Sequence, residues 1–127
     1  MKPHLYCMME VGTREFLARC LTACVAAERG FKVLLGHQHT LMEHATILPQ
    51  GIYYSKGTNA IATANMAHAL EHGHLTVACE EENFFRVLND NPLDVTDQKL
   101  SDVCNVFLAM GEEEEAHLRK RFGESIQ

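Results

Sequence analysis

Five short apolar runs recur along the chain, and helical spacing of apolar residues follows each of them. Short runs that are apolar throughout are typical of strands buried on both faces of a parallel sheet. The alternation of strand and helix predicts βαβ units with right-handed crossovers. The predicted strands cover residues 5–11, 31–35, 52–55, 75–79 and 106–109.

The stretch after the first run predicts an amphipathic helix that begins at Arg14. Its apolar residues recur at helical spacing and are expected to face the sheet. They are Phe16, Leu17, Cys20, Leu21, Cys24 and Val25. The opposite face carries Arg14, Arg19 and Glu28. Further helices are predicted at residues 38–45, 59–72, 82–88, 96–104 and 112–122.

This order of elements predicts an α/β three-layer sandwich, Rossmann-like, with a five-stranded parallel sheet. The 127 residues suffice for one domain, so we expect a single Rossmann-like domain over 1–127. The simplest strand order is 3-2-1-4-5, which makes strands one and four neighbours. Ligands bind beyond the carboxyl ends of strands in such sheets, at the point where the strand order reverses. The ends of strands one and four are therefore expected to face one crevice.

Composition and charge narrow the functional classes. The formal charge is −6, which argues against nucleic-acid binding, because that needs a basic surface. No apolar run is long enough to span a bilayer, and the N-terminus lacks the pattern of a signal peptide. The five cysteines form no CxxC pair, which favours reduced, buried thiols in a cytoplasmic protein over a redox or metal role.

Carboxylates at two strand ends are the main chemical candidates. Glu10 closes the first strand, where Arg14 is a natural partner, and Gly12 lies in the same turn. Glu80, Glu81 and Glu82 follow the fourth strand. Such carboxylates can act as a general base or bind a hydroxyl, or they can serve only as helix-capping and solvated groups. If strands one and four are neighbours, Glu10 and Glu81 line one pocket with Gly12 and Arg14.

No metal or cofactor is predicted. The first turn reads EVGTRE rather than GxGxxG, and neither GKS nor GKT occurs, so a standard NAD-binding or P-loop protein is not expected. His68 and His72 have a spacing that can bind a metal, but the sequence fixes no third ligand. A metal-dependent enzyme built on these two residues with His37 and His39 is the least favoured alternative.

Several segments, taken in order, resemble a known family. An acidic residue closing the first strand is followed by "RE" at the start of a helix that ends in "AAERG". After these come "KVLLG", "LPQGIYYSKG", "EHGHLTVACEEEN" and "VFLAMGEEEEAHLRKRF". In this order the segments resemble the N-terminal part of the bacterial surface carbohydrate biosynthesis proteins. These are GT-B-type glycosyltransferases of capsule and lipopolysaccharide assembly.

The resemblance implies an enzymatic activity that is divided between two domains, one for the acceptor and one for the donor. It implies that the chain is the acceptor-side half of an enzyme that transfers sugar from an activated donor to a glycan or glycolipid hydroxyl. The nucleotide-sugar donor would bind only through a C-terminal domain that this sequence does not contain. Glu10 and Glu81 are assigned as catalytic. The substrate-binding set is Gly12, Arg14, Glu80, Glu82 and Gly111.

The resemblance also implies a cytoplasmic location at the inner membrane. Peripheral membrane contact is therefore possible, but the chain itself shows no basic amphipathic helix that would bind anionic lipid. The alternative to a transferase half is a non-enzymatic, flavodoxin-like α/β binding or interaction module, which the lack of a phosphate loop and of a donor domain favours.

Overall fold

The sheet of the protein contains five parallel strands. The computed structural model describes residues 2–81 and 96–123. The strands are β1 (His4–Met9), β2 (Lys32–His37), β3 (Gly51–Ser55), β4 (Leu75–Ala78) and β5 (Val106–Phe107). The predicted α/β class and the five strands are confirmed, and the sheet order is β2-β1-β3-β4-β5.

The predicted strand order is wrong, because β3 lies between β1 and β4. β3 pairs with β1 from His4↔Gly51 to Cys7↔Tyr54. Buried aromatic packing accounts for this placement: the rings of Tyr6 on β1 and Tyr53 on β3 lie 4.7 Å apart, and the Tyr53 hydroxyl donates to the Leu41 carbonyl at 3.0 Å. The order of the sheet therefore reverses between β1 and β3.

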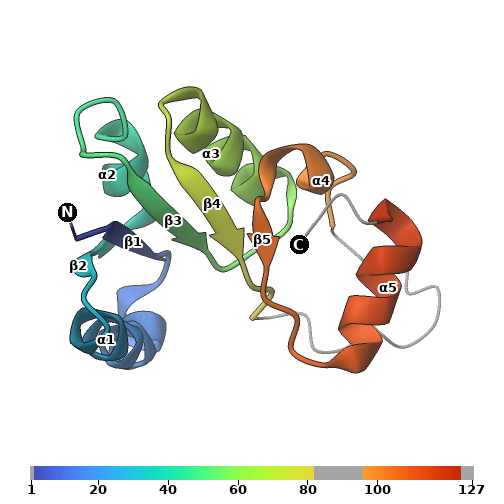
Figure 1. Cartoon of the computed structure of the whole chain (residues 1–127), viewed down its shortest axis with the longest axis horizontal. Helices are drawn as coiled ribbons and strands as arrows, with labels where there is room; N and C mark the ends of the chain where they lie inside the picture. The colour runs from blue at the N-terminus through green and yellow to red at the C-terminus, as the bar shows by residue number, and fades with distance from the viewer. Residues whose placement is uncertain (1, 82–95, 124–127) are drawn as a thin grey trace.

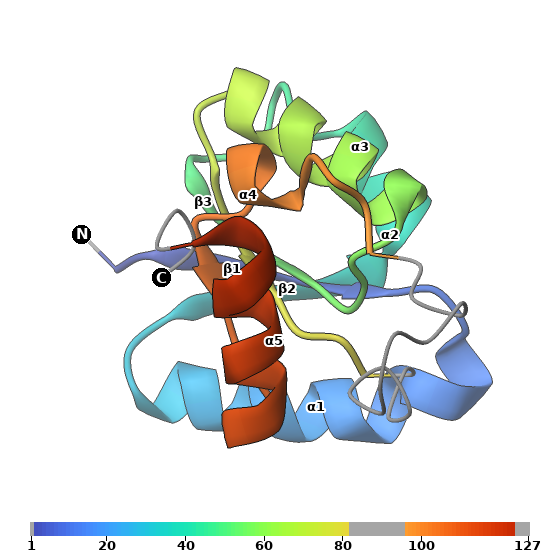
Figure 2. The same cartoon turned by 90° about the vertical axis from the view of Figure 1, so that its right-hand side faces the viewer.

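The helices form two unequal layers. Helix α1 (Gly12–Glu28) lies alone on one face of the sheet, where it packs on β1 and β2 (Figure 1). The opposite face carries α2 (Gln38–Glu43), α3 (Ala60–Glu71) and the short α4 (Leu100–Val103) (Figure 2). Helix α5 (Glu112–Phe122) stands beyond β5. The predicted helix at 82–88 lies outside the described residues, and the one at 96–104 is reduced to α4.

The apolar core lies on the side of α2, α3 and α4. One cluster joins the first strands to α2 and α3 and contains Tyr6, Met8, Leu41, Met42, Ala45, Tyr53 and Ala69. A second joins β4 and β5 to α3, α4 and α5 and contains Ala62, Met66, Ala78, Leu100, Cys104, Phe107 and Leu118. Both clusters lie on the same face of the sheet, so burial of this face supplies most of the hydrophobic stabilisation.

The orientation of α1 is the reverse of the prediction. Glu15 and Arg19 are its buried residues, whereas the exposed fractions of Phe16, Leu17 and Leu21 are 50%, 82% and 67%. The helix turns its polar side toward the sheet because polar partners lie there: the Arg19 guanidinium lies 4.6 Å from the Tyr54 ring centroid of β3. Its apolar stripe therefore points away from the chain's own sheet.

We expect Gly51→Ala to destabilise the fold, because β1 and β3 approach closely there. A Cβ on Gly51 would lie 2.7 Å from both Cβ and the carbonyl oxygen of His4. Overpacking against backbone costs about 1–3 kcal/mol, which urea denaturation measures directly. Gly111→Ala is the matched control, since a Cβ added there would meet nothing within 4 Å. Equal stability of both variants would contradict the close pairing of β1 with β3.

Candidate functional site

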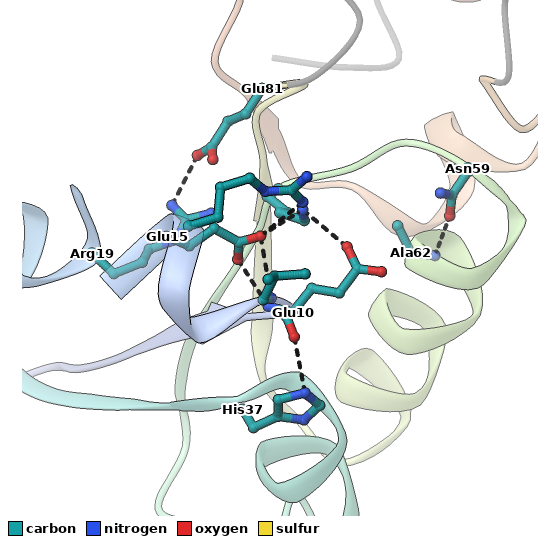
Figure 3. Close-up of polar contacts among 10 residues, drawn as sticks. Glu10, Glu15, Arg19, His37, Asn59, Ala62 and Glu81 are labelled. Carbon is teal, nitrogen blue, oxygen red and sulfur yellow. Dashed lines mark hydrogen bonds and ion pairs between the residues drawn. The ribbon is translucent and has the colours of Figure 1, made fainter. Parts of the chain in front are cut away.

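A lysine joins two carboxylates where the strand order reverses. Lys56 follows β3 directly, and Glu10 follows β1. The Lys56 ammonium lies 2.9 Å from Oε2 of Glu10 and 2.8 Å from Oε1 of Glu15. Figure 3 shows these two glutamates. Its side chain is only 12% exposed. This one cation therefore ties the loops after β1 and β3 to the first turn of α1.

Glu15 is the most strongly bonded carboxylate of this site. Its Oε2 accepts the backbone N–H of Glu10 at 2.8 Å, and its Oε1 accepts that of Val11 at 3.3 Å. Burial acts to raise the pKa of Glu15, but hydrogen bonds from Lys56, Glu10, Arg14 and Val11 outweigh it and lower the pKa to about 2. Glu15 is thus a fixed anion at physiological pH.

A second ion pair lies further along α1. Nη1 of the buried Arg19 lies 2.9 Å from Oε1 of Glu81, which follows β4 (Figure 3). The Tyr54 hydroxyl donates to the same oxygen at 3.2 Å. Burial, with a contribution from nearby Cys79, raises the pKa of Tyr54 to about 12, so its phenol stays protonated and remains a donor. Among the described residues, Nη2 of Arg19 is buried without a hydrogen-bond acceptor.

The Lys56 cluster and the Arg19–Glu81 ion pair border one pocket of about 440 Å³. Its lining consists of Arg14, Glu15, Ala18, Arg19, Lys56 and Glu81. The lining contains both hydrogen-bond donors and acceptors, with three cations and two anions. Such a mixture suits a neutral ligand with several hydroxyl groups better than a strongly charged one.

The structure brings some of the predicted residues together. Arg14 and Glu81 line the pocket, and Glu10 reaches it through Lys56. Arg14 was predicted to pair with Glu10, but its ion pair is with the neighbouring Glu15, at 3.2 Å. The cation that pairs with Glu10 is Lys56. Gly12 is exposed at the start of α1 and is not among the lining residues. β3 separates the strands that carry Glu10 and Glu81, so the two carboxylates do not meet directly.

The remaining predicted residues lie elsewhere. Glu80 is buried away from the pocket and accepts a hydrogen bond from the Thr58 hydroxyl at 2.8 Å. Gly111 is the exposed residue before α5 and does not line the pocket. Glu82 lies outside the described residues. Of the acidic run after the fourth strand, Glu81 is therefore the one described residue that faces the pocket.

Four residues of the site were missed from the sequence: Glu15, Arg19, Tyr54 and Lys56. Lys56 was detectable, since it directly follows the third strand and a strand order of 2-1-3-4-5 places it at the reversal point. Glu15 and Arg19 share one helix face at i,i+4 spacing, but six apolar residues on the other face outweighed them.

The histidines form no metal centre in the described part of the chain. No group of three or more His, Cys, Asp or Glu side chains there is placed to hold a metal ion. His37 instead donates from Nε2 to the Glu10 carbonyl at 3.0 Å and thereby joins the ends of β2 and β1 (Figure 3). Across residues 2–81 and 96–123, no helix combines the length and apolar character needed to cross a membrane.

Neither a protein-family model nor a curated protein matches this sequence. The function of the site therefore has to be inferred from its geometry. The fold and the site define an α/β protein with the strand order of flavodoxin-like sheets, with a charged crevice where that order reverses.

We expect Glu81→Gln to lower the free energy of unfolding by about 1–3 kcal/mol, because it leaves the buried Arg19 cation without its anion while Glu81 itself is partly exposed. Glu115→Gln is the matched control: Glu115 and Arg119 are also joined by a single contact, at 2.8 Å, but both side chains are about half exposed. An exposed pair contributes about 0–1 kcal/mol. Chemical denaturation of both variants compares the two pairs, and equal losses would contradict the burial assigned to Arg19.

Proposed function

We propose that this chain is the acceptor-side, N-terminal half of a glycosyltransferase of surface polysaccharide biosynthesis. The enzyme would transfer sugar from an activated donor to a glycan or glycolipid hydroxyl at the cytoplasmic face of the membrane. The resemblance of the motif order to that of surface carbohydrate biosynthesis proteins supports the proposal. So does a polar crevice at the carboxyl edge of a parallel sheet, where α/β proteins bind their ligands.

The availability of the Glu81 carboxylate carries the proposal. Its Oε1 accepts from Arg19 and Tyr54, while its Oε2 has no hydrogen bond or ion pair among the described residues. The side chain is 34% exposed in the pocket. Oε2 can therefore accept the proton of a bound acceptor hydroxyl while the hydroxyl oxygen bonds to the sugar and the donor's nucleotide leaves.

The second carboxylate of the proposal, Glu10, has a binding role. It is 49% exposed, and Lys56 holds it at the edge of the pocket. A carboxylate held in this way can accept a hydrogen bond from a second sugar hydroxyl. Two carboxylates anchored by two different cations would then fix a sugar ring at two points, which orients the reacting hydroxyl.

A non-enzymatic α/β binding module is the second candidate. The observation that favours it is that Glu10, Glu15 and Glu81 all carry a cation already, Lys56 on the first two and Arg19 on the third. Ion pairs of this kind can hold loops in place without any catalysis. The flavodoxin-like strand order is equally compatible with a module of this kind.

Glycan binding by Glu10→Gln separates the two candidates. We expect the wild-type chain to bind acceptor glycans saturably, and Glu10→Gln to weaken that binding by about 10-fold, because one sugar contact is lost. Glu113→Gln, an exposed carboxylate on α5, is the matched control and should bind as wild type does. Calorimetric titration with a panel of glycans and nucleotide sugars measures both. No glycan binding, or equal binding by both variants, would favour the module.

A further inference from the structure

Among residues 2–81 and 96–123, no helix covers half of one face of the sheet. Residues Ile52 and Tyr54 of β3 lie on the α1 face, and their sheet partners on β4 are Leu75 and Val77. Val77 in turn pairs with Val106 of β5. α1 packs on β1 and β2, so it leaves this apolar half of the face open (Figure 1). Parallel sheets occur almost always with both faces covered, which means that this face needs a covering layer.

The open face contains an apolar slot beside α1. The slot has a volume of about 250 Å³, and its lining is Leu5, Thr22, Phe31, Ile52, Tyr54, Val77 and Leu108. Leu75, Val106 and Leu108 are 55%, 36% and 47% exposed. The surface that no described helix covers is thus apolar across three adjacent strands.

Helix α1 has an apolar face that is exposed. Phe16, Leu17, Leu21 and Val25 form an exposed apolar ridge, with exposed fractions of 50%, 82%, 67% and 40%. The ridge points away from its own sheet, because Glu15 and Arg19 occupy the inner side of the helix. The described part of the chain therefore has an apolar helix face that no sheet covers and an apolar sheet face that no helix covers.

We infer that a second copy of this chain covers the open face, with its α1 lying beside the first α1. A two-fold axis running along the strands, between α1 and the open face, places each ridge on the other copy's slot. The dimer then has two outer sheets with both α1 helices between them, at the usual spacing of about 10 Å from each sheet. α1 lies on the opposite side of the sheet from α2, α3 and α4 (Figure 2). Tyr54, which lines the slot, faces α1, so ridge and slot are on the same side of the sheet, as an isologous interface requires.

The exposed area is sufficient for such an interface. Twelve large apolar residues are exposed in the described part of the chain, and seven of them lie on the ridge and the open face: Phe16, Leu17, Leu21, Val25, Leu75, Val106 and Leu108. Together they expose roughly 500 Å², close to the largest patches found on monomers. Two copies would bury on the order of 1,000 Å² from these residues alone, which reaches the lower bound for a specific interface.

Two substitutions test the two halves of this interface separately. Leu17→Glu places a charge on the ridge, and Leu108→Glu places one on the open face. Ile61→Glu is the matched control, because Ile61 is 65% exposed on α3, in the opposite layer. All three positions are accessible, so circular dichroism should show unchanged folding.

Sedimentation equilibrium at protein concentrations of about 1 to 100 µM measures the dimerisation of the wild type and of each variant. We expect wild type and Ile61→Glu to approach twice the 14.3 kDa mass of one chain. Leu17→Glu and Leu108→Glu should each raise the dissociation constant by about 10-fold or more. A monomeric wild type would overturn the inference, and the face would then await a different partner. A dimer that Leu17→Glu weakens and Leu108→Glu does not would also overturn it, because that interface would join helices only.

Discussion

The contact of Lys56 with two glutamates is the constraint on which the site depends. The strand order reverses between β1 and β3, so the loops after these strands diverge at this point. Lys56 closes the divergence by bonding Glu10 from one loop and Glu15 from α1. Without a cation there, a buried and an exposed carboxylate would face each other across the reversal point, and charge repulsion would open the crevice.

The same constraint explains the unusual orientation of α1. Once Glu15 is drawn to Lys56, the residue one helical turn later, Arg19, must also face the sheet. Arg19 finds a ring to stack on and an anion to pair with, Tyr54 and Glu81, so the polar face is satisfied. The apolar stripe is then left outside. The charged crevice and the exposed ridge are therefore two results of one rotation of the helix.

The sequence predicted the strands themselves better than it predicted which strands lie side by side in the sheet. Apolar runs located all five strands, because local periodicity reports burial on both faces. Strand order depends on contacts far apart in the chain, such as the packing of Tyr6 on Tyr53, which no local pattern encodes. Glu10 and Glu81 could be chosen from the sequence because each lies within three residues of the end of a strand. Lys56 and Arg19 were missed, since their roles appear only after the order of the sheet and the rotation of α1 are known.

The pKa of the Glu15 carboxyl tests the Lys56 cluster most directly. A carboxyl-selective NMR titration from pH 7 downward follows this group in the folded protein. Because bonds from Lys56 and from two backbone N–H groups stabilise the anion, Glu15 should stay ionised far below the ordinary glutamate pKa of 4.5 and titrate only near pH 2. A midpoint close to 4.5 would show a solvated carboxylate, and it would contradict both the Lys56 bridge and the rotation of α1 that follows from it.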